Sequence, residues 1–132
     1  MEDLSLYKVR ISVLWLLAMS ALVVSFVLTI MERGITEQID GFPTDDATLL
    51  FLAIIFLGAL VMAFLSLTLK DKANRWANII MGTVFLAITL YHLIGILVLP
   101  SYNPTSHTIL LWGLSVVFKG LIVWHAYKWP KN

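Results

Sequence analysis

The sequence contains no cysteine, which excludes disulfides, thiolate nucleophiles, iron–sulfur clusters and cysteine-ligated zinc. Charged residues are also scarce, at 13% of 132 residues against about 25% in soluble domains. Hydrophobic residues make up 60%. A water-soluble protein of this length could not bury so much apolar surface. The composition therefore predicts a single domain whose solvent is lipid.

Four long apolar runs occupy most of the chain. Each has about the 20 residues needed to cross a hydrocarbon core of roughly 30 Å, and in lipid only a helix keeps the backbone of such a run hydrogen-bonded. The first run is longer than the apolar part of a cleaved leader, so we expect it to be retained. The predicted class is all-α, a transmembrane four-helix bundle. Its spans are expected at about residues 11–31, 47–69, 76–99 and 108–127.

Basic residues gather on one side of these spans, where seven Lys and Arg residues lie against Arg33 alone on the other side. The positive-inside rule therefore predicts a multi-pass plasma-membrane protein with both termini cytoplasmic. On the opposite side, residues 32–46 are expected to form an acidic, solvated loop, with a short amphipathic turn at 35–39 as the alternative. The seven basic residues are Lys8, Arg10, Lys70, Lys72, Arg75, Lys128 and Lys131.

Aromatic residues occur near the same ends of the spans. Trp and Tyr are enriched where a membrane meets water, because their rings are apolar and carry one polar group. We therefore expect these rings to form an aromatic belt at the inner interface. Its members are Tyr7, Trp15, Trp76, Trp124, Tyr127 and Trp129.

Two short motifs stand at the inner ends of the third and fourth spans. Residues 72–79 read KANRWANI, and residues 121–124 read LIVW. With these motifs the chain resembles a family of small four-span prokaryotic integral membrane proteins of unknown function. The resemblance implies a four-helix bundle in the plasma membrane and supplies no activity or site. From the residues themselves, we expect Asn74 to cap the third helix, Arg75 to reach lipid phosphates and Asn78 to hydrogen-bond a neighbouring helix end.

Lys119 is a charged residue in the middle of the fourth span, where insertion scales give a cost of about 2.5–3.5 kcal/mol for lysine. Every carboxylate of the sequence lies in a loop or at a helix end, so no internal counter-ion is expected. The amine is expected to be neutral, to lie in a polar cavity, to bond hydroxyls and carbonyls, or to pair with an external anion. Snorkelling along its own helix toward the inner surface is a further alternative.

Other polar residues are predicted to face Lys119. Each lies on the small or polar face of its own helix, at about 100° per residue, and a rise of about 1.5 Å per residue places them at similar depths. We therefore expect a ligand-binding pocket that opens toward the outer face, with Lys119 at its floor. Serines and threonines that merely bond their own helix carbonyls are the structural alternative. The candidate site residues are Lys119, Ser115 and Trp112 on the fourth span, His92 and Thr89 on the third, and Ser25 on the first.

Several functions remain open. The first is binding or transport of a small anionic or amphipathic ligand, such as a lipid headgroup, quinone or carboxylate, near Lys119. The second is a structural or accessory subunit of a membrane complex or homo-oligomer, because Ala59 with Ala63, and Gly113 with Gly120, would allow close helix approach. A channel would require an oligomer. An enzyme is disfavoured, since the histidines lie at different depths and the spans hold no paired carboxylates. No cofactor, metal or nucleic-acid partner is expected.

Overall fold

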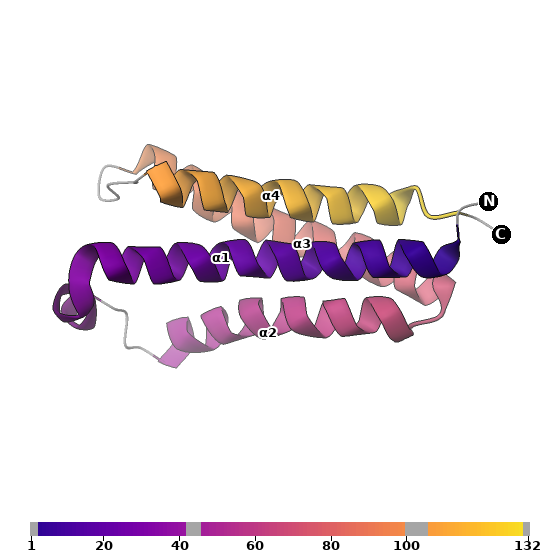
Figure 1. Cartoon of the computed structure of the whole chain (residues 1–132), viewed down its shortest axis with the longest axis horizontal. Coiled ribbons are helices and arrows are strands. Elements are labelled where there is room, and N and C mark those ends of the chain that lie inside the picture. Colours follow the sequence, from indigo (N-terminus) through magenta and orange to yellow (C-terminus); the bar gives the residue numbers. More distant parts are fainter. Residues whose placement is uncertain (1–2, 42–45, 100–105, 131–132) are drawn as a thin grey trace.

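The computed structural model describes residues 3–41, 46–99 and 106–130. Within these residues the chain forms α1 (Leu4–Gly41), α2 (Asp46–Thr68), α3 (Asp71–Val98) and α4 (Ser106–Tyr127). All four helices are long and apolar enough to cross a membrane, which indicates a multi-pass membrane protein. They lie side by side, and the start of α1, the α2–α3 turn and the end of α4 are at the same end of the bundle (Figure 1). The prediction of an all-helical chain is confirmed for the described residues.

The bounds of α2 and α4 lie close to the predicted spans, whereas α1 and α3 are longer. α1 continues to Gly41, so the prediction of a loop over residues 32–46 is wrong for this part of the chain. The first proline of the sequence is Pro43, and a helix usually ends before the residue that precedes a proline. α3 begins at Asp71, whose negative charge is favourable in a first helical turn. Residues 42–45 lie outside the described part.

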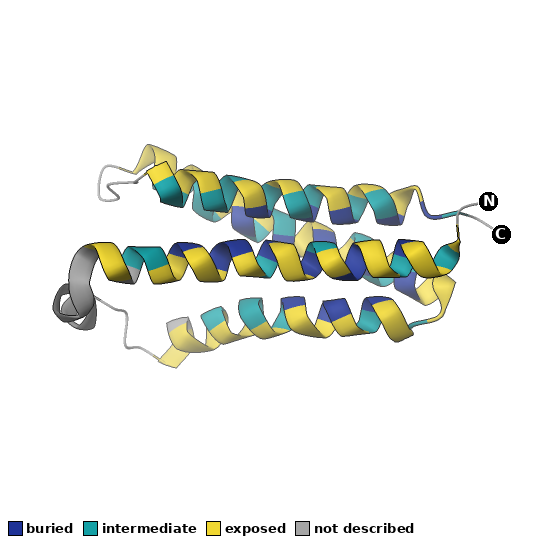
Figure 2. Ribbon diagram, viewed as in Figure 1, coloured by how far each residue is buried: buried dark blue, intermediate teal, exposed yellow. Residues whose placement is uncertain are grey.

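The helices form a ring in the order α2, α1, α4 and α3. α1 packs against α2 and α4, α3 packs mainly against α4, and the α2–α3 interface is the least extensive of the four. Buried side chains lie on the inward faces along the helices (Figure 2). One apolar face of α4 is exposed, as a face that meets lipid would be, and consists of Leu110, Leu114, Val117 and Leu121.

The two surfaces expected to allow close helix approach lie in different places. Ala59 and Ala63 are buried in the core of the bundle, so they bring α2 close to its neighbours within one chain. Around Gly113 and Gly120, in contrast, an added Cβ would meet no other atom within 4 Å. The α4 glycines therefore leave open space in the bundle described here.

A buried hydrogen-bond network joins α1, α2 and α3 in the half of the bundle near the α2–α3 turn. Trp15 Nε1 donates to Asn78 Oδ1 (2.7 Å), and Ser66 Oγ donates to the same oxygen (3.1 Å). Asn78 Nδ2 donates to Asn74 Oδ1 (2.7 Å), while Asn74 Nδ2 donates to the Ser66 carbonyl (2.6 Å). All four residues are fully buried. Asn78 thus bonds other helices as predicted, but Asn74 bonds the end of α2 and does not cap α3.

The predicted aromatic belt is divided by the fold. Trp76, Trp124 and Tyr127 are exposed, as a belt requires. The other three rings are buried because their positions face the bundle: Trp15 lies one turn from the fully buried Ile11 on the inner face of α1. Tyr7, Trp15 and Trp129 therefore pack inside the bundle, and the exposed part of the predicted belt consists of the other three rings.

Side chains from α1 and α3 satisfy carbonyl groups at the ends of other helices, which an α-helix leaves without internal partners. Lys8 Nζ donates to the Leu69 carbonyl (3.1 Å), just beyond α2, and pairs with Asp71 Oδ1 (3.0 Å). Arg75 donates from Nε to the carbonyl of Ala126 (3.3 Å). It also donates from Nη2 to the carbonyl of Tyr127 (3.5 Å). Arg75 therefore caps α4. The sequence predicted a contact of Arg75 with lipid phosphates and not this cap.

Candidate functional site

Lys119 lies inside the bundle, with 2% of its surface exposed. Its ammonium donates to Thr89 Oγ1 (2.5 Å) on α3 and lies 5.9 Å from the centre of the Phe85 ring. Thr89 in turn donates to the Phe85 carbonyl of its own helix (2.8 Å). Among the residues described, no carboxylate is within ion-pair distance of Lys119. The side chain therefore bonds a hydroxyl between helices, and the snorkelling alternative is wrong.

The two candidate serines are buried, and the hydroxyl of Ser115 bonds another helix. Ser115 Oγ, one turn from Lys119 on α4, donates to the Ala18 carbonyl of α1 (3.2 Å). Ser25 is also buried, and its carbonyl accepts a hydrogen bond from Thr29 Oγ1 (2.8 Å). Ser115 thus joins α4 to α1, which is a structural role.

His92 and Trp112 belong to a stack of rings contributed by three helices. The imidazole of His92 lies between Phe51 of α2 (5.8 Å, 20° between planes) and Trp112 of α4 (5.8 Å, 15°). Tyr91 meets the imidazole edge-on (5.8 Å, 80°). The sequence analysis missed Phe51 and Tyr91, because a ring in an apolar span carries no signal of what it will stack against.

The hydrogen bonds of His92 determine which of its nitrogens faces a ligand. Nδ1 lies 3.0 Å from the Ile88 carbonyl, which can only accept, so Nδ1 carries a proton. Nε2 has no partner among the described residues, and the side chain is half-buried. In the neutral imidazole Nε2 is an acceptor, and in the charged form it is a donor. Either form can bind one polar group of a ligand.

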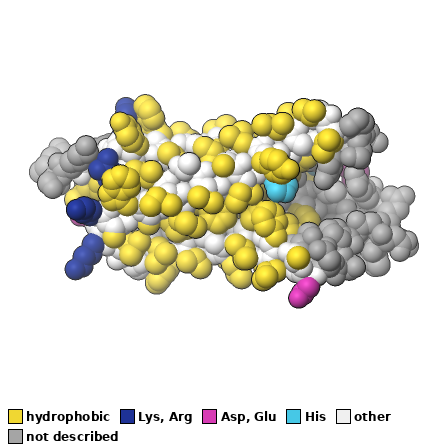
Figure 3. All heavy atoms as spheres, turned by 180° about the vertical axis from the view of Figure 1, so that it is seen from behind, with side chains coloured by type: hydrophobic (Ala, Val, Ile, Leu, Met, Phe, Trp, Pro, Cys, Tyr) yellow, Lys and Arg dark blue, Asp and Glu magenta, His cyan; other side chains and the backbone are white. Residues whose placement is uncertain are grey.

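A cavity of about 510 Å³ adjoins these rings between α3 and α4, in the half of the bundle away from the chain termini. Small-molecule sites typically have volumes of about 300–1,000 Å³ and apolar walls with a few polar groups. The surface seen from behind carries hydrophobic side chains along its length with histidine among them, while Lys and Arg gather at one end (Figure 3). The residues that line the cavity are Tyr91, His92, Ile94, Gly95, Ile96, Val98, Leu99 and Trp112.

The candidate residues therefore form two adjoining groups rather than one pocket. Lys119 and Thr89 form a closed polar contact, whereas His92 and Trp112 face open space. Thr89 precedes His92 by one turn of α3, or about 4.5 Å of rise. Lys119 lines none of the three cavities described in this structure. The cavity at His92 therefore begins about one helical turn beyond Lys119, the residue predicted to form the floor of the pocket.

The remaining histidines do not line this cavity and have partners of their own. His107 Nε2 lies 2.8 Å from Glu32 Oε2, a contact that joins α4 to α1. His125 Nδ1 lies 2.8 Å from the Leu121 carbonyl near the end of α4. In the described part of the chain, no group of three His, Asp or Glu side chains is placed to hold a metal ion. The site at His92 thus offers hydrogen bonding, ring stacking and apolar contact.

Comparison with sequence models of protein families, with curated proteins and with solved structures finds no match to this chain. The resemblance to small four-span prokaryotic membrane proteins therefore stays a prediction. Any functional conclusion depends on the geometry described above.

Proposed function

We propose that this chain binds a small amphipathic molecule within the membrane, with the polar head of the ligand at His92 and Trp112. The observation that carries the proposal is the cavity of about 510 Å³ that adjoins the imidazole. Its walls are apolar side chains of α3 and α4, which suit a hydrocarbon tail. Nε2 of His92 supplies a directional polar contact, and the faces and edges of Trp112 and Tyr91 suit a flat head group.

The buried amine of Lys119 is evidence that the head group of the ligand is acidic or electron-rich. An amine buried without a carboxylate partner is costly in hydrocarbon, and such residues usually mark functional sites. Its bonding partner Thr89 is one turn from His92, on the same side of α3. A positive charge at this depth attracts a negatively charged group more strongly than it would in water. The buried lysine thus biases the deep end of the cavity toward anions and carbonyl oxygens.

We also propose that the protein lies in the plasma membrane with both termini in the cytoplasm. The support is the asymmetry of Lys and Arg along the sequence, which favours the cytoplasmic side for the end that holds both termini. In this orientation the His92 cavity lies toward the outer leaflet. A ligand would then enter from the lipid, between α3 and α4.

Quenching of tryptophan fluorescence by a short-chain benzoquinone with a decyl tail tests the binding proposal. In purified protein we expect a saturable component that comes from Trp112 and is lost in Trp112→Phe. His92→Leu should weaken the apparent affinity about fivefold, since it removes one hydrogen bond. Decanoate as a competitor tests the acidic head group, and its competition should weaken in Lys119→Met.

The matched control is Trp124→Phe, which removes an exposed ring of the same helix, outside the cavity. This variant should keep the saturable component. Quenching that rises linearly with quinone and is identical in wild type and Trp112→Phe would show simple partition into the apolar phase and would refute the proposed site.

A further inference from the structure

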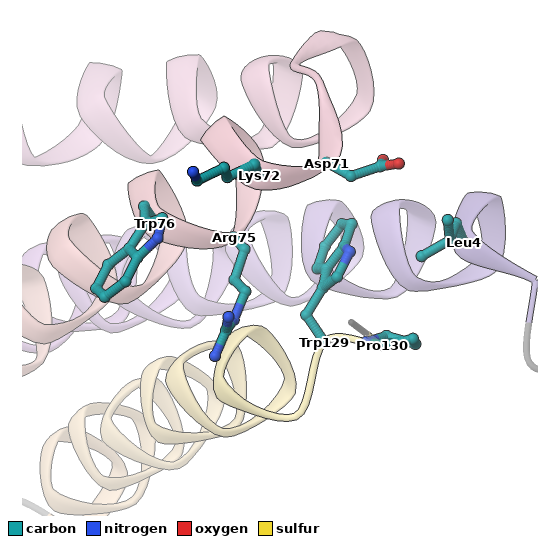
Figure 4. Close-up of a pocket in the computed structure, with 7 residues that line it drawn as sticks. All are labelled: Leu4, Asp71, Lys72, Arg75, Trp76, Trp129 and Pro130. Atoms are coloured by element: carbon teal, nitrogen blue, oxygen red, sulfur yellow. The ribbon is translucent and has the colours of Figure 1, made fainter. Parts of the chain in front are cut away.

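A second cavity, of about 250 Å³, lies at the opposite, basic end of the bundle. Its walls come from three places: the start of α1, the first turns of α3, and the segment that follows α4 (Figure 4). Two tryptophan rings, Trp76 and Trp129, line it together with the cations Lys72 and Arg75. The cavity is separate from the His92 site and shares no residue with it.

Trp129, one of the residues that line this cavity, carries an unused hydrogen-bond donor. The side chain is 3% exposed, and its Nε1 is the one buried side-chain nitrogen or oxygen in the described residues that has no hydrogen-bond partner. The ring is held in place by Tyr7 (5.8 Å between centres) and by a backbone bond to Ala126 (3.3 Å). Buried donors are normally paired, so an unpaired one calls for an acceptor that the described residues do not supply.

The charges around the cavity favour an anion. Arg75 uses Nε and Nη2 on the α4 carbonyls, but a guanidinium has five N–H groups, so others remain for a ligand. Lys72 is exposed and has no partner among the described residues. Asp71 is the carboxylate in the cavity wall, and Lys8 pairs with it at 3.0 Å. Two cations with spare donors therefore oppose one carboxylate whose charge is already offset.

We infer that this cavity binds a phosphate ester, most simply the headgroup phosphate of an anionic lipid. Phosphate oxygens are strong acceptors, which suit Lys72, the free N–H groups of Arg75 and the indole N–H of Trp129. Trp76 is half exposed beside Arg75 (5.8 Å from guanidinium to ring), and its indole suits the glycerol region next to a lipid phosphate. A free phosphate ester presents the same chemistry and is distinguished from lipid by experiment. The inference does not depend on the function proposed for the His92 cavity.

Native mass spectrometry of the detergent-solubilised protein with phosphatidylglycerol, and separately with phosphatidylcholine, tests this site. We expect phosphatidylglycerol to bind more tightly. Lys72→Gln should weaken its binding about fivefold, as one interfacial lysine typically does. The control is Lys128→Gln, which removes the same charge at the same end, where Lys128 stacks on Trp124 (4.3 Å) outside the cavity. Equal losses in the two variants, or equal binding of the two lipids, would refute the site.

Two further arms address the indole and the source of the phosphate. Trp129→Phe keeps most of the ring and removes the N–H, so binding should fall about threefold while the thermal midpoint is retained. An unchanged affinity in this variant would remove Trp129 from the site. Competition by sn-glycerol 3-phosphate at concentrations similar to the lipid would identify a free phosphate ester as the ligand, whereas competition by the lipid alone supports a headgroup site.

Discussion

Asn78 joins three helices through one side chain. Its carbonyl oxygen accepts hydrogen bonds from Trp15 of α1 and Ser66 of α2, and its amide donates to Asn74 of α3. Every member of this network is buried, so none can turn to water when a partner is lost. In hydrocarbon such a network fixes which faces of the helices meet.

Replacement of Asn78 by Leu should therefore destabilise the bundle by about 2 kcal/mol, because the indole N–H of Trp15 is left without an acceptor. The free energy of unfolding in mixed micelles is the quantity to measure. Trp15→Phe should cost less in the Asn78→Leu background than in the wild type, since the shared bond is already lost and only the packing term remains. Stability equal to wild type in Asn78→Leu would show that the network does not hold the helices together.

At single residues, the sequence predicted whether a side chain faces the inside of the bundle better than it predicted which residue that side chain contacts. The inward position of Lys119 and Thr89 follows from helical periodicity, and both side chains are buried as expected. Periodicity does not state which residue of one helix lies opposite which residue of another. The sequence therefore suggested a pocket at Lys119, whereas the register of α3 on α4 places Thr89 against it and the open space at His92.

Among the elements, α2 and α3 make the least extensive neighbouring contact, and a glycine of α2 lies against a ring of α3. A Cβ added at Gly58 would lie 2.6 Å from Cζ of Phe85. The Phe85 ring cannot easily retreat, because it packs edge-on against the fully buried Trp15 (5.5 Å, 82°). Gly58 thus allows α2 to approach the ring that also lies beside the Lys119 ammonium.

Gly58→Ala should accordingly destabilise the protein by about 1–3 kcal/mol through overpacking. The matched control is Gly113→Ala, where the same methyl group meets no atom within 4 Å and should be neutral or stabilising by up to about 1 kcal/mol. Unfolding free energies of both variants can be compared under the same conditions. Phe85→Leu should relieve part of the loss in Gly58→Ala, and equal stability of the two alanine variants would contradict the steric explanation.

The four helices were predictable because runs of about 20 apolar residues have few alternatives in lipid. The helical extension of α1 beyond residue 31 was not, since a polar segment outside the membrane lacks the apolar periodicity from which helices are recognised. The early start of α3 at Asp71 was missed for a related reason. Its first turn is charged and lies in what reads as a loop.

For the whole molecule, the absence of cysteine makes the proposed orientation directly testable. Ser5 lies at the basic end and Ser106 at the start of α4, at the other end, and both are exposed. In right-side-out vesicles we expect a membrane-impermeant maleimide to label Ser106→Cys at once and Ser5→Cys only after lysis. The reverse pattern would overturn the cytoplasmic placement of the termini and leave the four-helix fold intact.

Polar bonds between the helices are unevenly distributed along the bundle. The asparagine network, the Lys8 contact and the Arg75 cap all lie in the half that holds both termini. Near the middle of the bundle, Ser115 bonds the Ala18 carbonyl and Lys119 bonds Thr89. Toward the other end, ring stacking and the pair of His107 with Glu32 connect the helices. The helices are thus joined by more polar bonds at the end that holds both termini than at the opposite end, where they can separate more easily. A small separation of α3 and α4 at that opposite end would widen the His92 cavity toward the acyl chains. It would break none of the polar bonds at the end that holds the termini.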